Sequence, residues 1–399
     1  MPIAKDWNWR HESDANINKF RKSNIVITVH THGSVDLNQV EVEIKQTKKS
    51  FPFGTAISSN EYYHGDTRYQ NFVNQHFNWA VSESWLKWHM MEPHRGHINY
   101  DTPIRAIKKL RQHGIKVRGH NIIWSATKYV QDWVKALSGN ELKKAVHDRI
   151  TGVVAKTKDL VEHWDVNNEN LHNFYYQNKL HDINYNLDVF RQAHQAAPNV
   201  KMFLNEYDVV AGGGTTEAYL TQALKFKHAN VGLYGLGVQS HFNHQAPDPA
   251  LVKSHLDTLA QAGLPIWVTE LDFHINDEHT RADAYEMALR LFYGHPAVEG
   301  IMLWGFWSEH RWGGKTSALV SGQEFRINPA GQKVLHLFEK EWMTHETHRL
   351  SQSGKHFTVR AFHGDYEVHV RYRGREVTDQ RQTFTLGKSA HTINLHVSH

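Results

Sequence analysis

The segment His163-Trp164-Asp165-Val166-Asn167-Asn168-Glu169-Asn170 is a short, largely apolar run that ends in polar residues and a carboxylate. A second segment of this kind, Pro265-Ile266-Trp267-Val268-Thr269-Glu270-Leu271-Asp272-Phe273, follows later in the chain. Each segment predicts a buried strand with a glutamate at its end. A carboxylate at the mouth of a buried strand is costly to desolvate. Two of them therefore suggest an acid and a nucleophile that different strands deliver to one cleft.

Short apolar runs like these two recur on both sides of them in the sequence, between residue 51 and about residue 344. Each short apolar run is followed by a longer amphipathic stretch that predicts a helix, and such helices are expected at 102–113, 140–155, 248–262 and 281–293. Near-continuous apolar runs are typical of parallel strands buried on both faces. The eight runs are 53–57, 79–83, 117–124, 163–168, 200–205, 236–241, 265–270 and 300–306. They predict an α/β protein with a (β/α)8 TIM barrel. An open doubly wound sheet is disfavoured, because no Gly-rich phosphate loop follows the first run.

The two ends of the chain differ from its middle. Strand patterns at 25–29 and 40–44 flank a turn around Gly33, and further patterns lie at 357–362, 366–372, 382–386 and 392–397. Because a single hairpin is barely stable alone, we expect both ends to combine into one small β-sandwich-like accessory module. The expected domains are 1–50 for its N-terminal strands, 51–344 for the catalytic barrel and 345–399 for its C-terminal strands. Exposed aromatic residues leave glycan binding by this module open beside a structural role.

Composition narrows the class of protein. Hydrophobic residues make up 40% of the 399 residues, and no apolar run approaches the ~20 residues of a membrane span. The net charge of +4 comes from scattered Lys and Arg, which argues against a nucleic-acid partner. Cysteine is absent, and the 32 histidines show no paired-ligand spacing. We therefore expect no metal and no cofactor, with a histidine-rich metal binder as a disfavoured alternative.

The candidate site consists of the polar and aromatic residues at the ends of the expected strands, because barrel enzymes carry their sites there. The sequence offers hydroxyl-binding side chains and Trp and Tyr platforms for sugar rings, but no Ser nucleophile elbow and no Cys–His pair. A polyol substrate fits this set best. Besides the catalytic pair Glu169 and Glu270, the expected substrate-binding residues are Glu83, Lys87, His120, Trp124, Asn168, Tyr207, Gln239, His241, Trp304 and Trp312.

The chemistry expected of the pair is glycoside hydrolysis. One carboxyl must stay protonated to donate to the leaving oxygen, and the other must be ionised to attack the anomeric carbon. Asn168 is placed to hold the 2-hydroxyl of the sugar. His241 is placed to hydrogen-bond Glu270 and fix its rotamer.

The two glutamate segments also carry a resemblance to a known family. Trp164-Asp165-Val166-Asn167-Asn168-Glu169 and Thr269-Glu270-Leu271-Asp272 resemble the acid/base and nucleophile segments of glycoside hydrolase family 10, the endo-β-1,4-xylanases. The resemblance runs from about residue 24 to residue 362 and is closest to the plant and animal branch, as in Phe51-Pro52-Phe53-Gly54. It implies that Glu169 is the acid/base, that Glu270 is the nucleophile, and that hydrolysis of xylan proceeds with retention, with the carboxyls ~5–5.5 Å apart.

The resemblance implies roles for further residues. His120 with Trp124, and Lys87, would line the side of the cleft that holds the glycone sugars. Gln239 and His241 would support the nucleophile. Trp304 and Trp312 would lie over the cleft.

Four positions depart from the usual pattern of this family. Ser84 replaces Asn, Trp85 stands where Glu is usual, Ser125 stands where many members have His, and Glu206 replaces Asp. Loss of the Asn amide leaves space near the outer glycone sugar, so an endo-β-1,4-glucanase or a dual xylanase/glucanase stays open. A non-catalytic glycan-binding protein on the same fold is the alternative from another class, disfavoured because both glutamates are present.

The partner and setting follow as expectations. We expect a polysaccharide substrate, xylan or also β-glucan, and neither nucleic acid nor membrane. The protein is expected to be a monomer that is secreted. Residues 1–5 lack the apolar core of a signal peptide, so a secreted protein implies that the signal segment was removed and Met1 added for expression.

Overall fold

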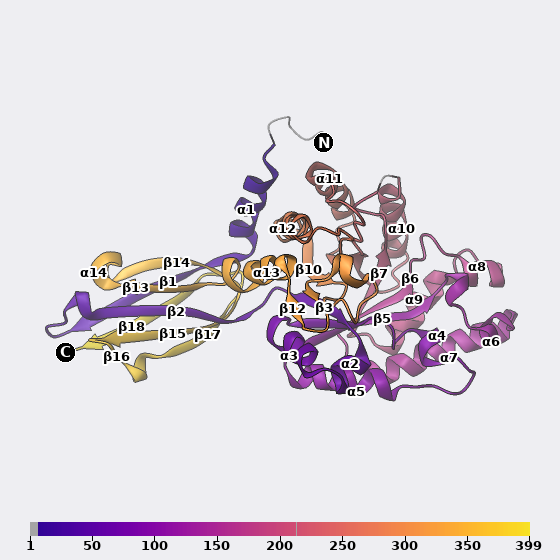
Figure 1. The fold of residues 1–399 in the computed structure, drawn as a ribbon, viewed down its shortest axis with the longest axis horizontal. Coiled ribbons are helices and arrows are strands. Elements are labelled where there is room, and N and C mark those ends of the chain that lie inside the picture. Colours follow the sequence, from indigo (N-terminus) through magenta and orange to yellow (C-terminus); the bar gives the residue numbers. More distant parts are fainter. Residues whose placement is uncertain (1–6, 213) are drawn as a thin grey trace. The chain divides into compact units, whose positions relative to one another are not determined.

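The structure is a computed structural model that describes residues 7–212 and 214–399. The chain forms two compact units (Figure 1). One unit contains Phe53–Lys333, and the other, the β-module, combines Asn8–Pro52 with Val334–His399. The boundaries expected from sequence lay at 50/51 and 344/345.

The first unit is a closed barrel of eight parallel strands within the described residues, in the order β10-β3-β4-β5-β6-β7-β8-β9. Strands consecutive in the sequence are neighbours, and β10 closes the barrel on β3 by pairing Ile301 with Phe53. The (β/α)8 prediction is confirmed. The strands are β3 (Phe53–Ile57), β4 (Trp79–Ser82), β5 (Lys116–Trp124), β6 (His163–Asn168), β7 (Lys201–Glu206), β8 (Leu233–Val238), β9 (Ile266–Leu271) and β10 (Val298–Leu303).

Helices connect successive strands of the barrel (Figure 1). The four expected helices are confirmed as α5 (Asp101–Gln112), α7 (Gly139–Thr157), α11 (Pro249–Ala260) and α12 (Glu278–Tyr293). Helix α5 buries Ile107 and Leu110 at helical spacing and is followed by Gly114, whose φ of +74° ends the turn. The other helices described wholly within this unit are α2 (Ser59–His64), α3 (Thr67–His76), α4 (Trp88–Met91), α6 (Asp132–Lys135), α8 (Tyr175–Leu180), α9 (Tyr185–Ala196) and α10 (Thr216–His228). Helix α13 (Pro329–His336) begins in it, and the short helix α14 (Leu350–Ser353) belongs to the other unit.

The barrel interior is filled by large aromatic side chains. Trp79 and Trp267 meet edge to face with ring centroids 4.8 Å apart, and His163 packs against both rings. Gly300 makes room for the Trp267 ring, since a Cβ at that position would lie 2.5 Å from it. Arg118 is buried with these rings and forms a two-pronged salt bridge to Asp165, with its shorter contact at 2.7 Å. This packed interior gives the strand ends a rigid base.

Two strands, β8 and β10, end three residues earlier than the sequence indicated. The apolar runs predicted strands to residues 241 and 306, but β8 ends at Val238 and β10 at Leu303. Left-handed backbone at Ser240 (φ +69°) and at Gly305 (φ +82°) breaks the two ladders. Beyond Val238, His241 keeps only an isolated bridge to Asp272. The chain therefore turns at the strand ends instead of continuing the barrel wall.

The β-module consists of two sheets that share one hydrophobic core, which includes Ile25, Ile27, Val42, Ile44 and Val368. The first sheet has the order β14-β1-β18, with β1 (Lys22–His32), β14 (His356–Phe362) and β18 (His391–Ser398). The second has the order β13-β2-β15-β16, and β17 pairs with β15; its strands are β2 (Val40–Lys49), β13 (His345–Arg349), β15 (Gly364–Tyr372), β16 (Arg375–Glu376) and β17 (Gln382–Leu386).

The hairpin suggested by the N-terminal strand patterns is wrong. Strands β1 and β2 lie in different sheets, so the turn at Gly33 joins two sheets. The strand expected at 40–44 is part of β2, in which Val40, Val42 and Ile44 are buried in the core and alternate with less buried residues. The sequence analysis missed helix α1 (Trp9–Phe20), which has a low apolar content, and strand β13, whose side chains are mostly exposed.

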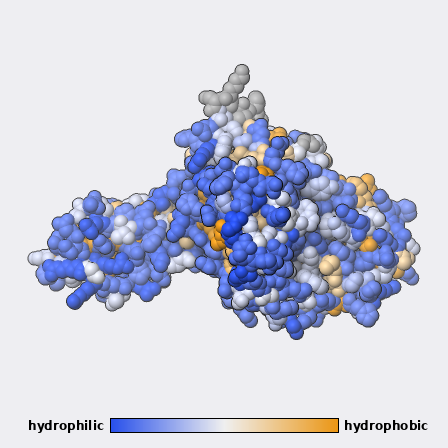
Figure 2. All heavy atoms as spheres, viewed as in Figure 1, coloured by the Kyte–Doolittle hydropathy of each residue, from blue (hydrophilic) through white to orange (hydrophobic). Residues whose placement is uncertain are grey.

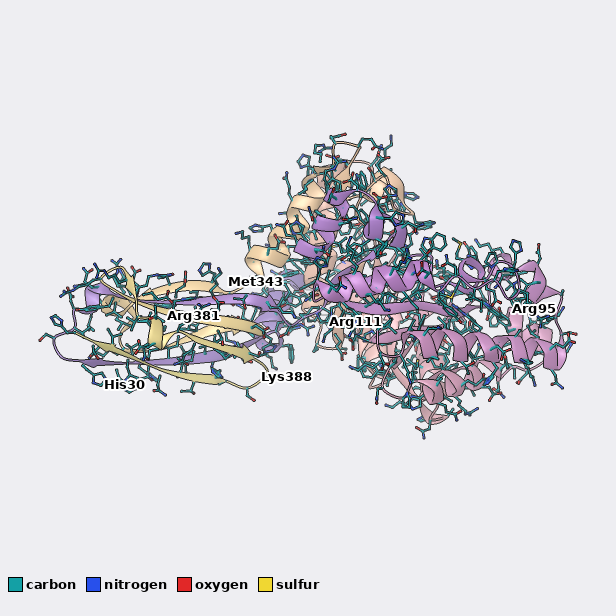
Figure 3. All side chains as sticks on the ribbon, turned by 90° about the horizontal axis from the view of Figure 1, so that it is seen from below. His30, Arg95, Arg111, Met343, Arg381 and Lys388 are labelled. Atoms are coloured by element: carbon teal, nitrogen blue, oxygen red, sulfur yellow. The ribbon has the colours of Figure 1, made fainter. Side chains whose placement is uncertain are left out.

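The surface is mostly hydrophilic on the face shown in Figure 2. In the β-module, exposed polar side chains include His30, Arg381 and Lys388 (Figure 3). No helix within the described residues is long and apolar enough to cross a membrane.

Candidate active site

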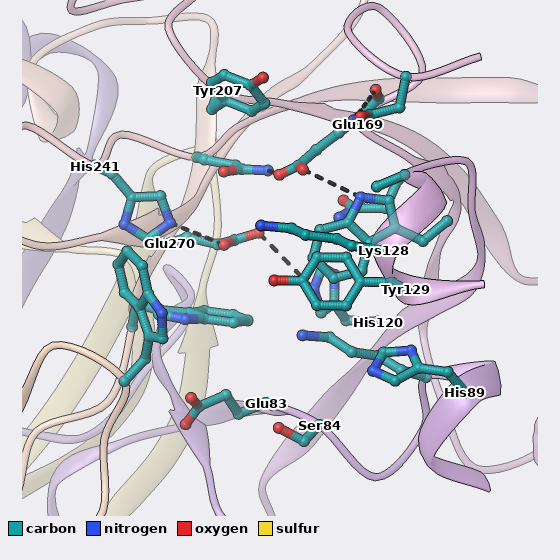
Figure 4. Close-up of a pocket in the computed structure, with 18 of the residues that line it drawn as sticks. Glu83, Ser84, His89, His120, Lys128, Tyr129, Glu169, Tyr207, His241 and Glu270 are labelled. Carbon is teal, nitrogen blue, oxygen red and sulfur yellow. Dashed lines mark hydrogen bonds and ion pairs between the residues drawn. The ribbon is translucent and has the colours of Figure 1, made fainter. Parts of the chain in front are cut away.

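The polar strand ends of the barrel surround a cleft of about 570 Å³ (Figure 4). Glu169 directly follows β6, and Glu270 is the penultimate residue of β9. The structure brings every site residue expected from sequence to this one cleft. Its lining includes Glu83, Lys87, His120, Trp124, Asn168, Glu169, Tyr207, Gln239, His241, Glu270, Trp304 and Trp312.

Glu169 is held by uncharged donors. Trp124 Nε1 donates to its Oε1 over 3.1 Å, and Gln239 Nε2 donates to its Oε2 over 2.8 Å. Burial raises the pKa of Glu169 to about 7, and the charges of Glu270 and Glu206 add to this effect against the hydrogen bonds. A large fraction of Glu169 therefore carries a proton near neutral pH.

The backbone of Glu169 is left-handed, with φ +57°. Its amide donates to the Asn205 carbonyl over 3.0 Å, and its carbonyl accepts hydrogen bonds from His172 N and from both nitrogens of Asn173. This conformation is unfavourable for a non-glycine residue and persists only where surrounding contacts hold it. The contacts aim the Glu169 side chain from the strand end into the cleft.

Glu270 is held mainly by a charged donor. His241 Nε2 donates to its Oε1 over 3.0 Å, Asn205 Nδ2 donates to its Oε2 over 2.8 Å, and His120 Nε2 lies 4.0 Å from Oε2. Burial alone would raise the pKa of Glu270, but the hydrogen bond from His241 and the charges of His120 and His241 outweigh it and lower the pKa to about 2. The carboxylate of Glu270 is therefore ionised at neutral pH.

His241 lies between two carboxylates. Its Nδ1 donates to Asp272 Oδ1 over 2.6 Å, and Asp272 in turn accepts from Arg311 Nη2 over 3.2 Å. Burial opposes the charged imidazolium, but the charges of Asp272 and Glu270 and the hydrogen bonds to them raise the pKa of His241 to about 10. The expected His241–Glu270 hydrogen bond is present. The buried Arg311 was missed from sequence, because it lies in the loop beyond β10 and does not line the cleft.

A parallel arrangement orients His120. Its Nδ1 contacts Asp165 Oδ2 at 2.8 Å, and its Nε2 faces Glu270. Asp165 is the residue that Arg118 holds in the barrel interior. The packed interior thus fixes the imidazole that stands beside Glu270.

Asn168 and Asn205 link the two glutamates. Asn205 Nδ2 donates both to Asn168 Oδ1 over 3.0 Å and to Glu270 Oε2, while Thr269 Oγ1 donates to Asn205 Oδ1 over 2.6 Å. These bonds fix the orientation of the Asn168 amide beside Glu169. Its expected contact with a sugar 2-hydroxyl stays a prediction.

Glu83 lies on the side of the cleft opposite Tyr207 (Figure 4). Lys87 lines the same cleft, with its Nζ 5.0 Å from the centroid of the Trp124 ring. Burial lowers the pKa of Lys87, although Glu270 and Glu83 act in the other direction, and burial raises the pKa of Glu83. Of the two unusual residues between them, Ser84 lines the cleft, whereas Trp85 is not among the lining residues. The space left by Ser84 is therefore cleft space.

Several lining residues were missed from sequence. Tyr129 stacks on Trp124 with ring centroids 4.0 Å apart, and Lys128 and His89 lie beside it (Figure 4). His89 lies in the short helix α4, and Lys128 and Tyr129 belong to a 3-10 turn, Thr127–Tyr129. Both elements lie beyond the strand ends, where no periodic signal places their residues. The further missed lining residues are Met90, Ala126, Asn173, Asp208 and Asn243.

Metal binding finds no support at this site. Among the residues that the structure describes, no group of three or more His, Cys, Asp or Glu side chains could hold a metal ion.

Comparison with known proteins identifies the family. Residues 43–337 match the model of glycosyl hydrolase family 10. The chain belongs to this family of glycoside hydrolases.

Individual relatives agree with this assignment. The chain is 36% identical to endo-1,4-beta-xylanase 1 of Arabidopsis thaliana over 356 residues, which are 88% of this chain and 37% of that protein. It is 35% identical to anti-sigma-I factor RsgI6 of Acetivibrio thermocellus over 387 residues, 97% of this chain and 48% of that protein. The chain thus spans less than half the length of these two curated relatives.

The fold also matches solved structures. TsXylA, an intracellular xylanase from Thermoanaerobacterium saccharolyticum, superimposes with a TM-score of 0.65 at 25% identity, covering 71% of this chain and 95% of that chain. A mutant of TsXylA was solved as a complex with xylotetraose.

Proposed function

We propose that this chain is a retaining endo-β-1,4-xylanase. The observation that carries the proposal is the opposite ionisation of two carboxyls in one cleft: the pKa of Glu169 is raised to about 7 and that of Glu270 is lowered to about 2. Glycoside hydrolysis requires one carboxyl of each kind. The xylanase relatives and the TsXylA complex with xylotetraose support xylan as the substrate.

In the first step of the proposed reaction, the Glu270 carboxylate forms a bond to the anomeric carbon. The glycosidic C–O bond breaks, and the proton of Glu169 passes to the leaving oxygen. His241 keeps its proton throughout and holds the Glu270 rotamer by the 3.0 Å hydrogen bond. The attacking oxygen is therefore positioned before the sugar arrives.

In the second step, water replaces the departed sugar. The Glu169 carboxylate accepts a proton from this water, whose oxygen bonds to the anomeric carbon and releases Glu270. Two inversions at one carbon give net retention. A carboxyl separation of ~5–5.5 Å belongs to this proposal.

The setting is proposed with the activity. Xylan is a polymer that does not cross a membrane, which supports a secreted protein acting in polysaccharide degradation. All residues of the cleft come from the barrel of one chain, which supports a monomer as the working unit.

The experiment that tests the proposal compares hydrolysis of unbranched xylan, carboxymethylcellulose and mixed-linkage glucan, with NMR observation of the first product. We expect the highest rate on xylan and β-anomer at early times. Early α-anomer contradicts retention, and a higher rate on either glucan contradicts the substrate assignment.

A further inference from the structure

One aromatic pair beside the cleft includes a residue that the proposed reaction does not use. The His172 ring lies face to face with the Tyr207 ring, with centroids 4.0 Å apart and an interplanar angle of 17°. Tyr207 lines the cleft, whereas His172 is not among the lining residues. His172 therefore covers the face of Tyr207 that is turned away from the substrate space.

A buried carboxylate anchors His172. The His172 Nδ1 group donates to Glu206 Oε1 over 2.6 Å, and Leu171 N donates to Glu206 Oε2 over 2.9 Å. Glu206 is the last residue of β7 and is fully buried. A buried carboxylate without these donors is strongly disfavoured. The end of β7 is thus hydrogen-bonded, through Glu206, to the segment that follows Glu169.

Electrostatic interactions stabilise the hydrogen bond between His172 and Glu206. The hydrogen bond to Glu206 raises the pKa of His172, burial opposes this, and the charges of Glu206, Asp208 and Glu169 add to the rise. The Tyr207 phenol is a further titratable group that faces the ring. Burial raises the pKa of Glu206, and the hydrogen bonds from His172 and Leu171 oppose that rise. The 2.6 Å contact is a charge-assisted hydrogen bond when His172 carries its second proton and Glu206 is ionised.

Tyr207 lies on the leaving-group side of the catalytic pair. In Figure 4, Tyr207 stands on one side of Glu169 and Glu270, and Glu83 and Ser84 stand on the other. Glu83 and Ser84 lie beside Lys87, which by family resemblance contacts the glycone. The sugar that receives the proton of Glu169 therefore departs past Tyr207.

We propose that His172, anchored by Glu206, is a positioning residue that holds the Tyr207 ring ready for the departing xylose unit. This rests on the proposed function. A half-exposed tyrosine has rotamer freedom that sugar binding must otherwise remove. The face-to-face imidazole removes it in advance and leaves the opposite face of the ring for the sugar. The unusual Glu206 has a role in this arrangement, because its carboxylate reaches the His172 ring.

The test separates the leaving-group side from the rest of the site by substrate. Xylohexaose fills both sides of the cleft, whereas β-xylobiosyl fluoride carries no sugar on the leaving-group side. His172→Asn removes the ring and keeps an N–H donor for Glu206, and His172→Ala removes both. Exposed His279 in the barrel gives the control variant His279→Ala.

We expect kcat/KM for xylohexaose to fall about tenfold in His172→Asn, mostly through KM, as suits the loss of one aromatic contact. We expect the same variant to stay within about twofold of the unmodified chain on β-xylobiosyl fluoride. In His172→Ala, kcat/KM for xylohexaose should fall by at least the same factor, and the Tm should also be lower. His279→Ala should change neither substrate.

A double-mutant cycle with Tyr207→Ala shows whether His172 acts through Tyr207. We expect His172→Asn to have almost no further effect on xylohexaose once Tyr207 is gone. An undiminished effect in that background, an equal loss on β-xylobiosyl fluoride, or no loss on xylohexaose overturns the positioning role while the xylanase proposal stands. If the unmodified chain does not cleave xylohexaose, both proposals fail.

Discussion

Glu169 and Glu270 are both glutamates, and each lies at the end of a strand of the same barrel. Both are largely buried, yet their surroundings give them opposite charge states. Around Glu169 the donors are the uncharged Trp124 and Gln239. Around Glu270 the principal donor is His241, which Asp272 keeps protonated. Burial raises the pKa of both carboxyls, but only Glu270 has cationic neighbours that reverse it.

This difference shows that burial by itself does not assign a catalytic role. A desolvated carboxyl remains an acid unless a fixed positive charge compensates the loss of water. The positive charge near Glu270 is itself maintained by a second carboxylate, Asp272, which accepts a hydrogen bond from Arg311. The charge state of Glu270 therefore depends also on Asp272 and Arg311, which do not line the cleft.

The largest expected effect is the loss of the nucleophile. Glu270→Ala should lower kcat on xylan by on the order of 10⁴-fold or more, because no other group can bond the anomeric carbon. Azide added to this variant should fill the vacated space and give an α-glycosyl azide from an activated aryl xylobioside. Product analysis by NMR checks this, and a β-azide from Glu270→Ala contradicts the assigned role.

The next effect is the loss of the acid, and it should depend on the leaving group. Glu169→Ala should lower kcat/KM on xylan by about 10²–10⁴-fold, the usual contribution of general acid catalysis. The loss should be much smaller for the first step with a dinitrophenyl xylobioside, whose leaving group needs no proton. Stopped-flow release of dinitrophenol measures that step. An equal loss on both substrates contradicts the acid role.

The opposite pKa shifts predict opposite effects on stability. Between about pH 4.5 and 7 the folded chain keeps a proton on Glu169 that the unfolded chain has lost, so this group destabilises the fold as the pH rises. Glu169→Gln should therefore raise the free energy of unfolding at pH 8 by about 3 kcal/mol. Little change is expected at pH 4. Urea unfolding at both pH values measures it.

Glu270 should behave in the reverse way. Its lowered pKa contributes stability that is present above about pH 4.5 and is lost as the pH falls toward 2. Glu270→Gln should lower the free energy of unfolding at pH 8. A gain of stability in both glutamine variants contradicts the comparison.

His241 is the residue whose positive charge makes the surroundings of Glu270 differ from those of Glu169. His241→Asn removes the positive charge, so the pKa of Glu270 should rise and the acid limb of kcat/KM should move upward by about one unit or more. A pH profile on a soluble xylo-oligosaccharide measures the shift. An unmoved acid limb contradicts the role given to His241.

The smallest effect is expected from the uncharged donor. Gln239→Leu removes a hydrogen bond that favours the ionised form of Glu169, so the alkaline limb, near pH 7 in the unmodified chain, should move upward by less than about one unit. The acid limb should stay in place, which makes this variant the matched control for His241→Asn. A downward shift contradicts the account of Glu169.

The sequence predicted the barrel well because its strands carry a strong local signal. The eight apolar runs and the helices between them follow from periodicity, and β3 and β6 have the predicted bounds. Polar residues at the strand ends supplied the candidate site, since all strands of a parallel barrel present their carboxyl ends on one side. The β-module was harder, because strand patterns do not say which strand pairs with which.

What the sequence determined by itself is the barrel and the identity of the catalytic pair, since both depend on short, regular patterns along the chain. Only the tertiary structure decided which carboxyl keeps its proton and which is ionised. The pKa of each carboxyl depends on hydrogen-bond donors that come from other strands and loops. The roles of Arg311, Tyr129 and His172 come from contacts with residues distant in the sequence. No local sequence pattern indicates these contacts. Charge states are set by three-dimensional neighbours, and those neighbours are distant in sequence.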